Sequence, residues 1–360
     1  MTSFIDEVCG DAHLRVEDDL GDGFVRLRSS EAQRRQAEHD IRCSEDIVIE
    51  LLRNAFDAGA KNIFVATSRE GEQRRICVID DGEGIPKNMQ AMIFEPRVTS
   101  KLDSMHIDKW GVHGRGMALY SISVNAKSAQ VVNSDKGRGS SFLVETDLGC
   151  LPEKTDQSAL PRFSYDESGQ LRIKGPHNIN RAIAEFAWEY ETDCVVYTGS
   201  PTEMAATLYG FGNATLTKGM RVFFDNLEEL PLAKRLCLAA DPSHFTDIAT
   251  SLGLDISQRS ARRIMDGDIK AVDPLLESLP QETPDARKKP VARKAPGRQA
   301  LLKDPRGLKI DAGDLNEFSD EIKAAWAGLA KRYYLEEAVI PEITLSPKGL
   351  HIEIPVKKLL

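Results

Sequence analysis

The chain has 360 residues, of which 41% are hydrophobic and 29% are charged, and its formal net charge is −9. This length and composition predict two or three globular domains and exclude wholesale disorder. The acidic balance excludes a protein that binds polyanions with its whole surface. A nucleic-acid contact would therefore have to come from a local basic patch.

Cysteine usage and the N-terminal residues bear on the cellular compartment. The six cysteines stand singly, with no CxxC pair and no His/Cys cluster, which favours reduced thiols over a disulfide framework or a zinc site. Acidic residues between Asp6 and Asp19 interrupt every short apolar stretch, unlike a signal peptide. No apolar run approaches the roughly 20 residues of a membrane helix. We therefore expect a cytoplasmic protein that does not bind membranes.

The first strong helical pattern runs from Ser44 to Ala58, after a polar segment that favours a short strand and a charged helix. We expect Ser44 to cap this helix and Gly59 to end it in a left-handed turn. Apolar residues recur on one face of the predicted helix. They are Val48, Leu51, Leu52 and Ala55.

Strand patterns follow this helix, and a glycine-rich loop with a helix from about Met117 interrupts them. The fold class that this order predicts is α/β, as a two-layer α/β sandwich with one antiparallel or mixed sheet and one layer of helices. The predicted strands cover residues 63–67, 75–79, 129–133 and 141–146.

A first motif places polar side chains on one face of the 44–58 helix. Glu50 and Asn54 are four residues apart, and Asp57 continues their row. A carboxylate beside an amide suits a hydrolytic site, because the amide oxygen can bind Mg²⁺ and the carboxylate can accept a proton from water. The competing interpretation, a polar stripe on an amphipathic helix, is the stronger one for this motif alone.

A second motif, Asp80-Asp81-Gly82-Glu83-Gly84, follows the strand at 75–79. Gly82 and Gly84 allow a backbone turn without side chains that would obstruct a flat ring. The carboxylate of Asp80, held at the end of a strand, can accept a hydrogen bond from an exocyclic amino group. An acidic β-turn is the competing interpretation.

A third motif combines Thr99 and Lys101 with glycines that precede the helix expected from Met117. Backbone N–H groups at the start of a helix form a phosphate cradle, and Lys101 can add positive charge near the terminal phosphates. The glycine run contains Gly111, Gly114, Arg115 and Gly116.

A fourth motif turns at Gly137 and Gly139 into the last strand of the group. Ser140 and Ser141 at the start of that strand would line the adenine side with a hydroxyl. Single glycine runs are weak signals. No GxxxxGK[ST] and no strand–GxGxxG–helix pattern occurs in the chain, which excludes a P-loop and a dinucleotide-binding unit.

The order and spacing of these four motifs, over residues 40–147, resemble the GHKL superfamily: type II topoisomerases, heat-shock chaperone ATPases, histidine kinases and MutL-type repair proteins. The resemblance implies a Bergerat-type ATP fold, with ATP and Mg²⁺ as its ligands. By position, Glu50 is similar to the general base, Asn54 to the Mg²⁺ ligand and Asp80 to the adenine-reading carboxylate. It also implies contacts of the nucleotide with the other residues of the four motifs: Asp57, Gly82, Gly84, Thr99, Lys101, Gly111, Gly114, Arg115, Gly116, Ser140 and Ser141.

Two branches of the superfamily remain open. A glutamate at position 50 resembles the hydrolysing MutL and topoisomerase branch and implies a slow ATPase that works as a conformational switch, often coupled to homodimer formation. Phe94 with Thr99 and Lys101 is similar to the corresponding box of histidine kinases. A histidine kinase also needs a histidine that accepts the phosphate, and His39 is the candidate upstream of the pocket motifs. We interpret His39 as a solvated helix residue. A protein kinase is therefore the alternative.

A further pattern at residues 246–265 resembles a helix-turn-helix, with two extra residues in the turn. Its second helix would direct Gln258, Arg259 and Arg262 towards DNA, which makes an ATP-sensing DNA-binding regulator another alternative. An ordinary helical hairpin explains the same pattern and carries somewhat more weight.

The remaining boundaries follow changes of composition. Proline-enclosed hairpin patterns at residues 161–176 and 341–355 each accompany a helical segment, so we expect additional α+β regions in the C-terminal part. The expected domains are a GHKL-like ATP-binding domain at 1–150, an α+β region at 151–230, a helical region at 231–280, a basic proline-containing linker at 281–310, and a helix with a hairpin at 311–360.

Overall fold

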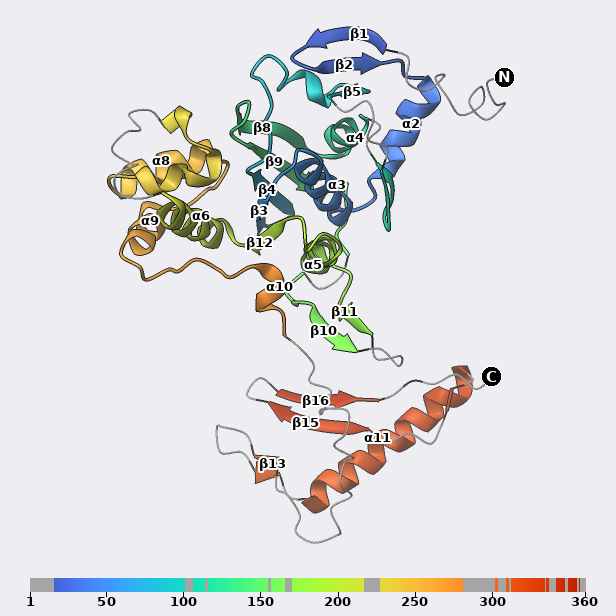
Figure 1. Ribbon diagram of the computed structural model, residues 1–360. Helices are drawn as coiled ribbons and strands as arrows, with labels where there is room; N and C mark the ends of the chain where they lie inside the picture. Colours follow the sequence, from blue (N-terminus) through green and yellow to red (C-terminus); the bar gives the residue numbers. More distant parts are fainter. Residues whose placement is uncertain are drawn as a thin grey trace. The chain divides into compact units, whose positions relative to one another are not determined.

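The computed structural model describes residues 16–100, 106–113, 116–154, 157–165, 170–216, 227–280, 302–303, 309–310, 312–333, 335–336, 341–346, 349–354 and 356. Two compact units make up the chain, Met1–Ala286 and Arg287–Leu360 (Figure 1). Among the described helices, none combines the length and the apolar character needed to cross a membrane.

A five-stranded mixed sheet forms the centre of the first unit, with strand order β12-β3-β4-β9-β8 (Figure 1). Only the β12–β3 pair is parallel, and the other neighbours are antiparallel. The mixed α/β class and the four predicted strands are confirmed. The strands are β3 (Asn62–Glu70), β4 (Gln73–Asp80), β8 (Ser128–Ser134), β9 (Ser140–Asp147) and β12 (Val195–Gly199).

One face of this sheet packs against helices α3, α4 and α5. Ile63 and Val65 of β3 are fully buried in this core, together with the apolar stripe of α3 that the sequence predicts. The helices are α3 (Ser44–Asp57), α4 (Ala118–Asn125) and α5 (Ile179–Glu189).

The opposite face of the sheet is also covered. Phe64 and Ala66 alternate with Ile63 and Val65 along β3 and are buried in a second core. The covering helices, all beyond residue 200, are α6 (Pro201–Thr215), η3 (Leu232–Leu238), α8 (Pro242–Ser251) and α9 (Gln258–Met265). The domain boundary at residue 150 stays a prediction, and the sheet itself takes β12 from beyond it.

The start of α3 differs from the sequence prediction. Cys43 occupies the N-cap position without a side-chain cap, and the Ser44 hydroxyl instead lies 3.4 Å from the Thr146 hydroxyl of β9. Asp46 accepts the backbone N–H of Arg42 at 2.9 Å and ties the entering chain to the first turn. The predicted end is confirmed, because Gly59 has φ +73°.

Smaller elements surround the sheet in the first unit. β2 joins β1 and β5 in a three-stranded sheet, β6 pairs with β7, and β10 pairs with β11, the last as the predicted hairpin. Their bounds are β1 (Val16–Gly21), β2 (Phe24–Leu27), α2 (Glu31–Asp40), η1 (Met92–Phe94), β5 (Val98–Thr99), β6 (His106–Asp108), β7 (Gly111–His113), β10 (Arg162–Tyr165), β11 (Leu171–Lys174), η2 (Leu227–Glu229) and α10 (Leu275–Ser278).

The described residues of the second unit form one long helix and two pairs of short antiparallel strands, β13–β14 and β15–β16. The predicted C-terminal helix and the 341–355 hairpin are confirmed. Residues 281–301 of the expected linker at 281–310 lie outside the described residues, so the linker stays a prediction. Near its end, β13 pairs with β14. The elements are β13 (Leu302–Lys303), β14 (Lys309–Ile310), α11 (Ala312–Tyr333), β15 (Glu342–Ser346) and β16 (Gly349–Glu353).

Candidate functional site

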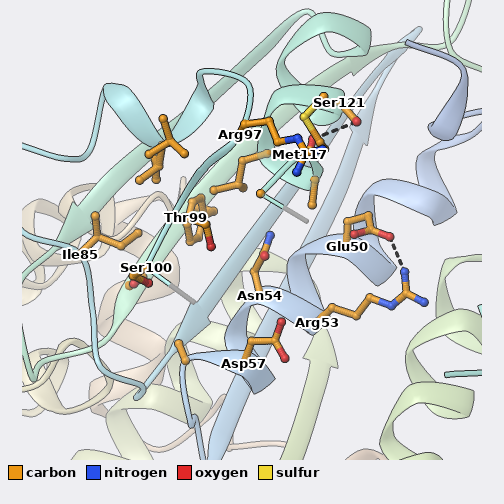
Figure 2. Close-up of a pocket in the computed structure, with 18 of the residues that line it drawn as sticks. Glu50, Arg53, Asn54, Asp57, Ile85, Arg97, Thr99, Ser100, Met117 and Ser121 are labelled. Carbon is orange, nitrogen blue, oxygen red and sulfur yellow. Dashed lines mark hydrogen bonds and ion pairs between the residues drawn. The ribbon is translucent and has the colours of Figure 1, made fainter. Parts of the chain in front are cut away.

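A pocket of about 710 Å³ opens beside α3 and the end of β4, a size typical of small-molecule sites. Figure 2 shows side chains from α3, the β5 segment and the start of α4 around it. The structure brings together at this pocket eight of the residues that the sequence predicts for the site. They are Glu50, Asn54, Asp57, Asp80, Gly84, Thr99, Gly116 and Ser140.

Asp80 ends β4 as a buried carboxylate that is only 1% exposed. Its Oδ1 accepts the N–H of Gly82 at 2.8 Å, which fixes its orientation in the turn. The carboxylate of the neighbouring Asp81 instead accepts hydrogen bonds from the backbone N–H groups of Lys61 and Asn62 at 2.7 and 2.8 Å. The first aspartate therefore lines the pocket, and the second holds the start of β3 against the turn.

Close backbone contacts explain the glycines around Asp80. Gly84 has φ +70°, and a Cβ there would lie 1.9 Å from the Asp135 carbonyl oxygen. Gly139 has φ +87°, and its Cβ would lie 2.0 Å from the carbonyl oxygen of Asp80. Two loops thus meet at a distance that excludes any side chain. Gly82 does not line the pocket, but a Cβ at that position would meet the Ala58 carbonyl at 2.7 Å.

The two serines at the start of β9 face opposite sides of the sheet. Ser140 pairs in register with Asp80, lines the pocket and accepts a hydrogen bond from the Ser134 hydroxyl at 3.1 Å. The hydroxyl of Ser141 instead donates at 2.8 Å to the carbonyl of Leu252, the C-cap residue of α8. Because neighbouring strand residues alternate between faces, only Ser140 reaches the pocket.

Glu50, Asn54 and Asp57 project from α3 into the pocket, as helical spacing predicts (Figure 2). Burial raises the pKa of Glu50 despite the lowering effect of the nearby Arg53 guanidinium, and the negative charges of Asp108 and Asp40 add to the increase. A partly buried carboxylate with a raised pKa is a stronger base than a fully exposed glutamate and suits proton abstraction from water.

The Asn54 amide at the pocket wall is a candidate ligand for a metal ion. Its nitrogen is buried and has no hydrogen-bond partner among the described residues. The nitrogen and oxygen of an amide exchange places by a half turn of the side chain, so the oxygen can serve an incoming ligand. An amide oxygen near carboxylates is the hard donor set that Mg²⁺ accepts, with the remaining ligands from water and phosphate. The residues present therefore fit this metal.

Two arginines at the pocket have no role in the sequence prediction. Arg53 Nη1 donates to Glu50 Oε1 at 2.5 Å, and the same guanidinium pairs with Asp108, which is 55 residues away along the chain. Arg97 is buried at the pocket wall with φ +65°. Its backbone N–H donates to the Gly116 carbonyl at 2.8 Å. The Arg53–Asp108 and Arg97–Gly116 contacts join separate segments, so no local pattern could have identified them, whereas Glu50 and Arg53 have the ordinary i,i+3 spacing of one helix face.

The predicted phosphate cradle is only partly described. Gly116 precedes α4 and lines the pocket, with Thr99 close by. Gly111 begins β7 (Gly111–His113), and its carbonyl lies 3.5 Å from Nη2 of Arg53, a residue of the pocket wall. Lys101, Gly114 and Arg115 fall outside the described residues. Their contacts with a nucleotide stay predictions.

Comparison with known proteins agrees with this geometry. The model of the histidine kinase-, DNA gyrase B-, and HSP90-like ATPase family matches residues 40–149. The DNA mismatch repair protein MutL of Staphylococcus aureus strains Newman, JH1 and COL is 37% identical over 123 residues. The alignment covers 33% of this chain and 18% of MutL, so the chain matches less than a fifth of the length of these relatives.

Proposed function

We propose that the chain binds Mg-ATP and hydrolyses it slowly as a conformational switch, because its residues 40–149 match the model of the histidine kinase-, DNA gyrase B-, and HSP90-like ATPase family. The observation that carries this proposal is one cavity lined both by the buried Asp80 carboxylate and by the α3 row Glu50, Asn54 and Asp57. One set suits recognition of an adenine, and the other suits hydrolysis of a phosphate bond.

Adenine recognition would depend on Asp80. A buried carboxylate that accepts a hydrogen bond from an exocyclic amino group rejects bases without that donor, because the carboxylate would then stay unpaired. Gly84 and Gly139 let the surrounding loops close around Asp80. Ser140 is the register partner of Asp80 on the neighbouring strand β9. Its hydroxyl would offer a second polar group to the adenine ring.

Hydrolysis would depend on Glu50 and Asn54. Glu50 would take a proton from the attacking water, and Asn54 would hold Mg²⁺ through its amide oxygen. When bound, the metal would neutralise charge on the phosphates. Arg97, buried in the same wall, adds a permanent positive charge that favours a polyanionic ligand.

Turnover of ATP by the full chain tests the proposal. We expect slow Mg²⁺-dependent hydrolysis that EDTA stops. Glu50→Gln should lower turnover roughly 100-fold or more, as loss of a catalytic base does, and should keep nucleotide affinity. Asp80→Asn should lower affinity for ATP roughly 100-fold. Wild-type turnover by Glu50→Gln would contradict the assignment of the base.

Phosphate transfer to protein is the second candidate. His39 is exposed in the last turn of α2, next to Asp40, which lines the pocket. Incubation of the chain with γ-labelled ATP distinguishes the two outcomes, since a kinase leaves acid-labile label on the protein and an ATPase releases inorganic phosphate. Label that His39→Gln removes would favour the kinase.

A DNA-linked role is supported by the repair function named for the MutL relatives and by α9. Gln258, Arg259 and Arg262 are exposed on α9, while Ala261 and Ile264 are buried against the rest of the helical layer. A gel shift at low and moderate salt, with Arg259→Gln/Arg262→Gln as the variant, tests DNA binding. The molar mass of the unmodified chain in solution, measured with and without a non-hydrolysable ATP analogue, tests nucleotide-driven homodimer formation.

A further inference from the structure

Arg53 joins the predicted catalytic base to a carboxylate on a separate hairpin. Its side chain and that of Asp108 are each only 5% exposed. Arg53 Nε donates to Asp108 Oδ2 at 2.8 Å, and Nη2 donates to Asp108 Oδ1. Nη1 then donates to Glu50 Oε1 at 2.5 Å. A planar guanidinium held on two nitrogens by one carboxylate has a fixed plane, so Asp108 determines where Nη1 meets Glu50.

The β6–β7 hairpin that carries Asp108 is anchored on both sides. Asp108 Oδ1 also accepts the backbone N–H of Trp110 at 2.8 Å. The Arg53 guanidinium lies 5.8 Å from the centre of the Trp110 ring, which in turn packs at 6.0 Å from Phe186 of α5. Lys109 Nζ donates to the Glu185 carbonyl at 3.1 Å. The hairpin is therefore tied to α3 through Arg53 and to α5 through its turn.

Arg53 neutralises the negative charges that surround Glu50. Asp108 and Asp40 are negative neighbours of Glu50, and Arg53 is its cationic neighbour on the same helix. Removal of the guanidinium would leave the buried Asp108 carboxylate and the partly buried Glu50 carboxylate without their shared cation, which is costly in a poorly solvated site. Glu50 would then turn away or take up a proton, and in both cases the base would be lost.

We propose that Arg53 is a positioning residue for Glu50, and that Asp108 on the β6–β7 hairpin holds Arg53 in the orientation that hydrolysis requires. Docking of the hairpin thereby controls whether the base is in place. This inference rests on the proposed ATPase function. It concerns the Glu50 side of the pocket, where Arg53 pairs with Glu50 and Asp108, and not the turn at Gly82 that orients Asp80.

The test compares single and double variants of the full chain. We expect Arg53→Met and Asp108→Asn each to lower kcat roughly tenfold, with KM for Mg-ATP changed less than about twofold, because positioning acts on the chemical step. The double variant should be no slower than Arg53→Met, since both changes break one unit. Arg53→Lys, which keeps the charge, should recover part of the loss.

Arg74→Met is the matched control. Arg74 and Glu153 form another buried ion pair, with side chains 9% and 6% exposed, and neither residue lines the pocket. The control should lower thermal stability as the Arg53 variant does, but keep kcat. Hydrogen exchange without nucleotide supplies a second readout: amides of residues 106–113 should exchange faster in Arg53→Met and Asp108→Asn and stay unchanged in Arg74→Met.

The outcomes separate this inference from the function on which it rests. A wild-type chain that fails to turn over ATP contradicts the proposed function. Wild-type turnover with an unaffected Asp108→Asn, or with losses in the double variant equal to the product of the single ones, overturns the role of the Arg53–Asp108 pair. Unchanged exchange at residues 106–113 in both variants overturns the tie between α3 and the hairpin, whatever the turnover.

Discussion

The Asp80 end and the Glu50 end of the pocket are built by different means. Around Asp80 the structure uses short side chains, backbone hydrogen bonds and glycines with positive φ, as at Gly84 and Gly139. Around Glu50 it uses long charged side chains, and Arg53 reaches from α3 to Asp108 on a separate hairpin. The first end is defined by backbone geometry, and the second by ion pairs between segments.

This difference indicates how the two ends respond to change. A backbone-defined end has few alternative conformations, so substitutions there should alter affinity or folding. An end defined by side-chain charges can rearrange with a moderate change in energy, so substitutions there should alter turnover and its dependence on the surroundings.

The largest effect is expected for Gly139→Ala. Its Cβ would lie 2.0 Å from the Asp80 carbonyl oxygen at φ +87°, so the turn cannot keep its position, and we expect a loss of about 3 kcal/mol or more in stability together with loss of nucleotide binding. Gly137→Ala is the matched control, because it has φ +75° but no atom within 4 Å of the added Cβ. It should cost only about 1–2 kcal/mol. Equal losses in urea unfolding would contradict the close-approach argument.

A moderate effect is expected from the serine pair. Ser140→Ala should weaken ATP affinity roughly three- to tenfold, because it removes a polar group beside Asp80. Ser141→Ala should keep affinity and lower stability by about 1 kcal/mol, because the buried Leu252 carbonyl loses its hydroxyl donor and keeps only the weaker Cys77 thiol. Calorimetry with ATP and thermal melting measure the two quantities. Weaker binding by Ser141→Ala alone would reverse the assignment of the faces.

The smallest effect is a pH-dependent gain in stability for Glu50→Gln. Burial raises the pKa of Glu50, so the folded state holds its proton to a higher pH than the unfolded state, and stability falls as pH rises between the two pKa values. Glutamine resembles the protonated form and avoids this loss. The variant should therefore melt at a higher temperature near neutral pH, and the difference should shrink on acidification towards the ordinary carboxyl pKa. A difference that grows on acidification would contradict the sign.

The sequence alone was sufficient for features that depend on neighbours along the chain. Helical spacing places Glu50, Asn54 and Asp57 on one face of α3, and a strand followed by glycines predicts Asp80 at a turn. Alternation along a strand could also have separated Ser140 from Ser141, because adjacent residues point to opposite faces. These features could be predicted since their geometry repeats over two to four residues.

Only the tertiary structure decided which distant groups meet. The pairing of Arg53 with Asp108, the approach of Gly139 to Asp80 and the attachment of Ser141 to Leu252 all join segments that are at least 55 residues apart along the chain. The packing of the helices beyond residue 200 on the second face of the sheet also joins segments that are far apart along the chain. Such contacts result from burial of apolar faces against each other, and a burial pattern specifies that a face is covered without specifying by which segment.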